Sequence, residues 1–184
     1  MLAVYLSAVE ESIPKKDKFL WVYENYRGHM LDFAYAVCRD RFLCEDAVHE
    51  TFLRLTKYID KIDENDYEGN LGLLHIMTKH TTINMYKKNS RVETWDTDDM
   101  NLVDVECNVE EEVIEKEIDR QLLDILYKLP QKTRDVLWMY YIKKFNTREI
   151  AEITDQKVDS IKKRLIRGRD ELRFHLRGKN NEQK

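Results

Sequence analysis

A run of polar side chains between residues 157 and 167 has the composition and spacing of a DNA-contacting surface. In the segment DQKVDSIKKRLIRGRDEL the apolar residues Val158, Ile161 and Leu165 recur at helical intervals, with basic residues between them. A helix with this pattern buries its apolar stripe and presents a basic face, which can bind phosphate and reach base edges. We therefore predict DNA contacts from Lys157, Asp159, Ser160, Lys162, Lys163, Arg164 and Arg167.

The preceding residues supply the elements that would position this basic helix. Pro130 suits the first turn of a helix that carries apolar residues at helical spacing up to Tyr141. Thr147 is a candidate N-cap for a short second helix, and Asp155 tolerates the left-handed backbone that a tight turn needs. A short helix, a tight turn and a long basic helix form a helix-turn-helix. The alternative is a plain amphipathic hairpin whose basic face is only solvated.

A second set of polar residues lies on a helix predicted from about Leu43 to Ile59. Glu50 and Arg54 are four residues apart and can form an ion pair on a solvated face. The same face could instead dock on a large partner, although the residues alone favour the solvated face. The candidate set is Asp46, Glu50, Leu53 and Arg54.

A third set gathers near the end of a helix predicted from Leu71 to about Lys88, after a polar loop from Lys61 to Asn70. Basic groups in a last turn are explained by the helix dipole, although they could equally hold a single DNA strand. The candidate set is Lys79, His80, Asn84, Lys87, Lys88 and Arg91.

The sequence favours no metal site, cofactor site or active site. Cys38, Cys44, His29 and His49 could be drawn as a zinc site, but their spacing fits no usual zinc pattern, and free thiols are the better interpretation. No paired carboxylates, glycine-rich phosphate loop or Ser/His/Asp set stands at usable spacing, so we expect no enzyme.

Charge and composition divide the chain into two parts. The 184 residues carry a net charge of −4, yet residues 131–184 hold 15 Lys and Arg against 8 Asp and Glu. Residues 89–112 contain nine acids and one base and are expected to form a flexible linker. We expect an all-α protein with an N-terminal extension (1–16), a helical domain (17–91), a linker (92–110), a helix-turn-helix domain without a wing (111–178) and a disordered tail (179–184).

No apolar run is long enough to cross a membrane, and the first residues lack the basic region of a signal peptide. We therefore expect a cytoplasmic protein that does not insert into membranes.

Two motif groups in this order resemble the sigma-70 family of bacterial transcription initiation factors, in particular the compact extracytoplasmic-function type that keeps only regions 2 and 4. The resemblance covers about residues 17–176. The motifs that carry it are CEDAVHETFLRL (44–55), LPQKTRDVLWMYY (129–141), TREIAEI (147–153) and IKKRLIRGRDELRFHL (161–176).

The resemblance gives each candidate set a role. It implies that Asp46, Glu50, Leu53 and Arg54 bind the clamp helices of the β′ subunit of core RNA polymerase. It implies that helix 71–88 and the loop before it melt and read the −10 promoter element, with residues 64–70 near an extruded base. The basic helix 157–173 would read the −35 element, and the acidic linker would thread toward the polymerase active site.

The same resemblance names the partners as promoter DNA, core polymerase (β′ clamp helices and β flap) and an anti-sigma factor. It implies a factor that gives core polymerase promoter specificity and carries no catalytic residues. The alternative is a stand-alone helix-turn-helix regulator that never binds polymerase. That alternative would need a dimer interface or a ligand pocket, and the sequence shows neither.

Overall fold

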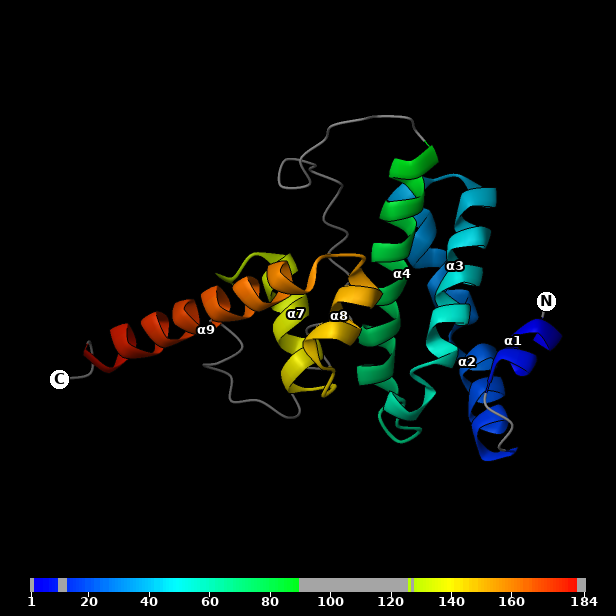
Figure 1. The fold of residues 1–184 in the computed structure, drawn as a ribbon, viewed down its shortest axis with the longest axis horizontal. Helices are drawn as coiled ribbons and strands as arrows, with labels where there is room; N and C mark the ends of the chain where they lie inside the picture. The colour runs from blue at the N-terminus through cyan, green and yellow to red at the C-terminus, as the bar shows by residue number, and fades with distance from the viewer. Residues whose placement is uncertain (1, 10–12, 90–125, 127, 182–184) are drawn as a thin grey trace. The chain divides into compact units, whose positions relative to one another are not determined.

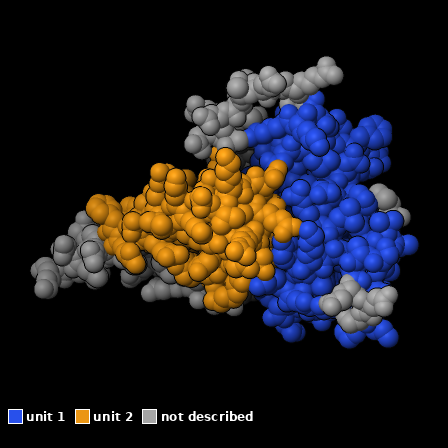
Figure 2. All heavy atoms as spheres, viewed as in Figure 1, with its two compact units in different colours: residues 1–107 blue, residues 108–184 orange. Residues whose placement is uncertain are grey.

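The computed structural model describes residues 2–9, 13–89, 126 and 128–181, and all regular structure in these ranges is helical. The chain forms two compact units, Met1–Cys107 and Asn108–Lys184 (Figure 2). The expected acidic linker lies outside the described residues. None of the described helices is long and apolar enough to cross a membrane.

Unit 1 is built on three long helices that pack against one another in pairs (Figure 1). They are α2 (Ile13–Cys38), α3 (Arg41–Thr56) and α4 (Tyr67–Asn89). A short helix α1 (Leu2–Ala8) precedes them, and a 3-10 turn η1 (Ile59–Lys61) follows α3. Helices α3 and α4 correspond to the two predicted at 43–59 and 71–88, with ends that differ by a few residues.

The core of unit 1 is the aromatic stripe of α2 packed on the inner faces of its neighbours. Phe19, Tyr26 and Met30 of α2 are fully buried, as are Phe52 of α3 and Leu74 of α4. The rings of Phe19 and Phe52 meet edge to face with centroids 5.8 Å apart, a favoured arrangement for aromatic pairs. The stripe is therefore a packing surface, as its spacing predicts.

The first described residues belong to this core. Tyr5 of α1 is 3% exposed and lies between the rings of Phe19, Tyr23 and Phe52. Pro14 occupies the first turn of α2. A proline is tolerated there because the first turn has no intrahelical acceptor for its missing N–H.

The start of α4 corrects the prediction that the polar stretch from Lys61 to Asn70 is a loop. The helix begins at Tyr67 because the Asp66 carboxylate accepts a hydrogen bond from the Gly69 amide at 2.9 Å, as an N-cap does. A Cβ on Gly69 would lie 2.1 Å from that carboxylate. Glycine is needed here because the carboxylate approaches the backbone closely, and not because the chain turns.

Asn70 is fully buried at the base of α4 and ties the preceding loop to the core. Its side-chain amide donates to the Asp63 carbonyl at 2.6 Å, and its side-chain oxygen accepts from the Asp63 amide at 3.3 Å. The amide also lies 3.5 Å from the Tyr26 hydroxyl. Burial raises the pKa of Tyr26 to about 12, so this hydroxyl stays protonated at neutral pH.

Unit 2 contains α7 (Gln131–Tyr141), α8 (Thr147–Thr154) and α9 (Val158–Asn181) (Figure 1). Helix α9 packs closely on α7 at Gly168, where an added Cβ would lie 2.7 Å from Thr133 Cγ2 and 3.0 Å from Leu137 Cδ1. The helix continues to Asn181, three residues into the segment expected to be a disordered tail.

Replacement of Asn70 by alanine should lower the free energy of unfolding by about 1–3 kcal/mol, because it removes a buried side chain that is hydrogen bonded to both backbone groups of Asp63. Urea unfolding of the full chain, followed by circular dichroism, measures the loss. Asn65→Ala is the matched control, since Asn65 is exposed in the same loop and should cost about 0.5 kcal/mol or less. Equal losses in the two variants would contradict the role assigned to Asn70.

Candidate nucleic-acid and protein interfaces

Helix α8 begins with a capping box, and the N-cap is one residue earlier than expected. The Asn146 side chain accepts hydrogen bonds from the amides of Arg148 and Glu149, and the Glu149 carboxylate accepts from the Asn146 amide at 2.7 Å. Thr147, predicted as the N-cap, is the first helical residue. Both residue types cap well, and the Glu149 spacing selects Asn146.

The turn between α8 and α9 has the left-handed residue that the sequence predicts. Asp155 has φ 53° and ψ 46°. The Gln156 amide donates to the Ala151 carbonyl at 2.9 Å and the Asp155 amide to the Glu152 carbonyl at 3.4 Å, which is the Schellman pattern. Thr154, just before the turn, is buried, and its hydroxyl donates to the Ile150 carbonyl at 2.7 Å.

Helix α9 separates its faces as the periodicity predicts. Ile161 and Leu165 are buried, and Val158 is partly buried. Most of the residues predicted to contact DNA are exposed to solvent, whereas Arg164 is partly buried. The exposed ones are Lys157, Asp159, Ser160, Lys162, Lys163 and Arg167. The Lys162 ammonium lies 4.0 Å from the Asp159 carboxylate, a separation at which an exposed pair holds neither side chain tightly.

Arg169 has a packing role that its charge does not suggest. It is partly buried, and its guanidinium lies 5.8 Å from the Tyr140 ring centroid and 5.9 Å from that of Tyr141. Arginine is attracted to aromatic faces at such distances, so this residue joins α9 to α7 within unit 2.

The set predicted on α4 follows the last three turns of that helix. His80, Asn84, Lys87 and Lys88 are spaced by four, three and one residues and so lie along one side. Lys88 is exposed, and Lys79, His80, Asn84 and Lys87 are partly buried. Arg91 lies outside the described residues.

The set predicted on α3 lies on one side of that helix, away from its buried residues. Asp46 is exposed, whereas Glu50, Leu53 and Arg54 are partly buried. The predicted ion pair is present, with Arg54 Nε 2.9 Å from Glu50 Oε1 and side chains 25% and 40% exposed.

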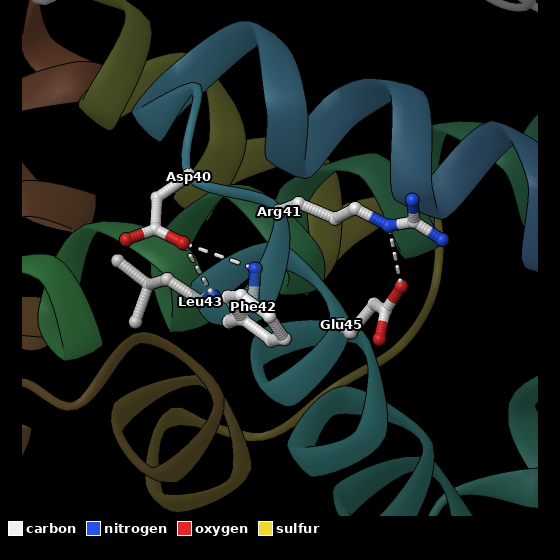
Figure 3. A network of polar contacts seen from close by, with 5 residues as sticks. All are labelled: Asp40, Arg41, Phe42, Leu43 and Glu45. Atoms are coloured by element: carbon white, nitrogen blue, oxygen red, sulfur yellow. Dashed lines mark hydrogen bonds and ion pairs between the residues drawn. The ribbon is translucent and has the colours of Figure 1, made fainter.

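The beginning of α3 shows a residue that the sequence analysis missed. The Asp40 carboxylate accepts from the amides of Phe42 and Leu43, and Arg41 pairs with Glu45 at 3.1 Å (Figure 3). This cap leaves the Phe42 side chain 80% exposed, one helical turn before Asp46. An apolar residue four positions before an acidic candidate was the signal that could have found it.

The four residues of the hypothetical zinc site do not come together around one point. The His49 ring is hydrogen bonded to the Tyr5 hydroxyl, and His29 Nε2 lies 3.2 Å from the Tyr67 hydroxyl. Cys38 and Cys44 are free thiols in contact with each other. Among the described residues no group of three or more His, Cys, Asp or Glu side chains is arranged to hold a metal.

Two family profiles match this chain in the order of its two units. The profile described as "Sigma-70 region 2" matches residues 22–92, and that described as "Sigma-70, region 4" matches residues 119–172. The first span contains most of α2 and all of α3, η1 and α4, and the second contains α7, α8 and most of α9.

Similar proteins are described as sigma factors. The "ECF RNA polymerase sigma factor SigM" of Bacillus subtilis (strain 168) is 26% identical over 162 residues, covering 88% of this chain and 97% of the relative. "ECF RNA polymerase sigma factor SigW" of the same organism is 28% identical over 170 residues, covering 88% and 90%. The solved sigma factor RpoE, in complex with the anti-sigma factor NepR from Bartonella quintana, is 15% identical and covers 86% of this chain and 96% of its own, with a TM-score of 0.35.

The positions of Lys163 and Arg167 on α9 predict that their substitution has different effects on DNA binding. Lys163 is exposed near the helix N-terminus, where recognition helices reach deepest into the major groove. Arg167 is exposed one turn later and should lie over phosphate. We expect Lys163→Ala to change which bases are tolerated, at about 1–3 kcal/mol per lost base contact. Arg167→Ala should weaken binding on all sequences alike and reduce the salt slope by about one unit.

Binding to a library of randomised −35 sequences at several salt concentrations measures both effects. Arg173→Ala is a control, because Arg173 is exposed farther along α9 and pairs with Asp170 at 3.2 Å. A changed sequence preference in Arg167→Ala, with an unchanged one in Lys163→Ala, would show that the helix enters the groove differently.

Proposed function

Because this chain belongs to the sigma-70 family and is of the extracytoplasmic-function type, we propose that it binds core RNA polymerase and directs promoter-specific initiation as an alternative sigma factor. The observation that carries the proposal is the match of regions 2 and 4, in that order, within one short chain. A stand-alone helix-turn-helix regulator needs no region 2, so that alternative is not favoured.

In this proposal unit 2 binds the −35 element through α9. The support is the exposed basic face that the Asp155 turn and the buried Ile161 and Leu165 place opposite the packed face. Basic side chains on such a face release counterions from DNA when they bind phosphate, which makes affinity strongly dependent on salt.

Unit 1 binds core polymerase through the outward side of α3 and the −10 element through α4. The support on α3 is a mixed surface in which the exposed Phe42 precedes Asp46 and the Glu50–Arg54 pair. An exposed aromatic beside charged groups is a common composition for a protein interface, because the ring supplies most of the buried area. We add Phe42 to the polymerase-binding set on this ground.

The charge distribution fits a factor that recognises DNA only together with polymerase. The region after residue 130 is basic, whereas the chain as a whole carries −4. A negative overall charge lowers non-specific affinity for bulk DNA, while the local basic surface remains available for a promoter. We also propose that an anti-sigma factor binds this protein. The basis is its membership of the family and not any single structure.

Run-off transcription on a genomic library, with core polymerase and this protein, tests the proposed function. Transcripts that start at defined sites only when the protein is added are the expected result. Specific DNA binding without binding to core polymerase would instead support the stand-alone regulator.

The double variant Asp46→Ala/Glu50→Ala should lose affinity for core polymerase by about tenfold or more, which is about 1.4 kcal/mol. Its free energy of unfolding should change by no more than about 0.5 kcal/mol, because the Glu50–Arg54 pair is partly solvated. Phe42→Ala should weaken binding in the same way. Affinity is measured by titration of labelled protein with core polymerase.

The matched control is Asp17→Ala/Glu24→Ala, which removes two exposed acids from α2 and makes the same change in net charge. The control should bind core polymerase as the unmodified protein does. If both double variants bind equally well, the docking surface lies elsewhere.

A further inference from the structure

Two cysteines meet at the turn between α2 and α3. Cys38 is the last residue of α2, and Cys44 lies in the first turns of α3. Between them Arg39 adopts a left-handed backbone with φ 52°, and Asp40 caps α3. This sharp reversal places the sulfur atoms 3.0 Å apart.

At that distance the two sulfur atoms need to move only a little to form a disulfide bond. A disulfide has an S–S length of about 2.05 Å, so the two sulfur atoms need to approach by about 1 Å. The turn that must absorb this movement contains no buried side chain, because Arg39, Asp40, Arg41 and Phe42 are all exposed.

The two thiols differ in ways that give them separate parts in an oxidation. Cys38 is partly exposed, whereas Cys44 is 2% exposed. Burial raises the pKa of the Cys44 thiol to about 12, so Cys44 is a poor first nucleophile. Cys38 therefore reacts with an oxidant first, and Cys44 is in contact with the oxidised Cys38 sulfur.

We propose that Cys38 and Cys44 are a redox-sensitive pair, which a peroxide converts reversibly into an intramolecular disulfide. The Cys38 sulfur attacks one peroxide oxygen, the O–O bond breaks, and Cys38 becomes a sulfenic acid with release of one water. The Cys44 sulfur then displaces the hydroxyl group from the Cys38 sulfur, and a second water leaves. Two thiols lose two electrons to the peroxide, and their two protons end in the two waters.

Because the pair lies at the turn between α2 and α3, the reaction would link these two helices within unit 1. The disulfide would join the end of α2 to the start of α3, beside the exposed Phe42. Disulfides in reducing compartments are mostly transient or redox-sensing, and a pair held in contact at a surface turn is suited to that use. The reaction itself needs neither polymerase nor DNA, so its test is independent of the proposed function.

Peptide mapping of the full chain after treatment with excess hydrogen peroxide tests the proposal. Trypsin cleaves after Arg27, Arg39, Arg41 and Arg54, so Cys38 and Cys44 fall in separate peptides, 28–39 and 42–54. The expected result is a linked pair of these peptides, which dithiothreitol separates. The same linkage should form in Cys107→Ser, where these two cysteines are the only ones left.

Two further variants keep the proposal open to refutation, with circular dichroism as the check that each folds. In Cys44→Ser the sulfenic acid on Cys38 should persist long enough for a dimedone probe to trap it, and Cys38→Ser should give no trapped product on Cys44. The proposal fails if the folded Cys107→Ser protein keeps both thiols free under peroxide. It also fails if Cys38 and Cys44 are found only in bonds to other chains.

Discussion

The left-handed backbone at Asp155 is the constraint on which the presentation of α9 depends. Only a residue that accepts positive φ can close α8 with Schellman hydrogen bonds and let α9 start three residues later, at Val158. The Ala151 backbone carbonyl accepts one of these bonds, from the Gln156 amide at 2.9 Å. With the turn fixed, Ile161 and Leu165 face the interior, and Lys162 and Lys163 between them are exposed to solvent.

In unit 1 the position of α4 is fixed by hydrogen bonds of polar side chains and not by a left-handed residue. Asn70 satisfies both backbone groups of Asp63, and Asp66 caps α4, so a stretch rich in Asp, Asn and Gly is held against an aromatic core. The helices that result are long and well packed. Their outward sides can therefore carry charges such as Asp46 and Lys88 without a cost to the fold.

The helices and their buried faces could be predicted from the sequence because apolar spacing is a local property. The buried stripe of α2 and the inward residues of α9 follow directly from it. The start of α4 could not be predicted, because Gly69 and Asn70 are usual in loops and only tertiary contacts show why they are helical and buried here. The N-cap of α8 was displaced by one residue since Asn146 and Thr147 are both good caps.

The residues of the candidate interfaces were predictable in position but not in surroundings. The sequence places Glu50 and Arg54 one turn apart, and the ion pair forms. The spacing of Phe42 four residues before Asp46 is only a weak signal, because its exposure depends on how the Asp40 cap sets the first turn of α3. The contact of Cys38 with Cys44 depends on a left-handed arginine, which no propensity of Arg39 would suggest. Both features arise from one turn, which local periodicity does not describe.

The packing of α1 has a practical consequence for anyone who trims this protein. A chain shortened to begin at residue 17 would keep every residue assigned to DNA or polymerase. It would nevertheless lose Tyr5, whose ring covers Phe19 and Phe52 and whose hydroxyl holds His49. Uncovered aromatic surface of this kind promotes self-association. Such a fragment would precipitate or bind many surfaces weakly, and its behaviour in a binding assay would report the exposed core and not the interface of the intact protein.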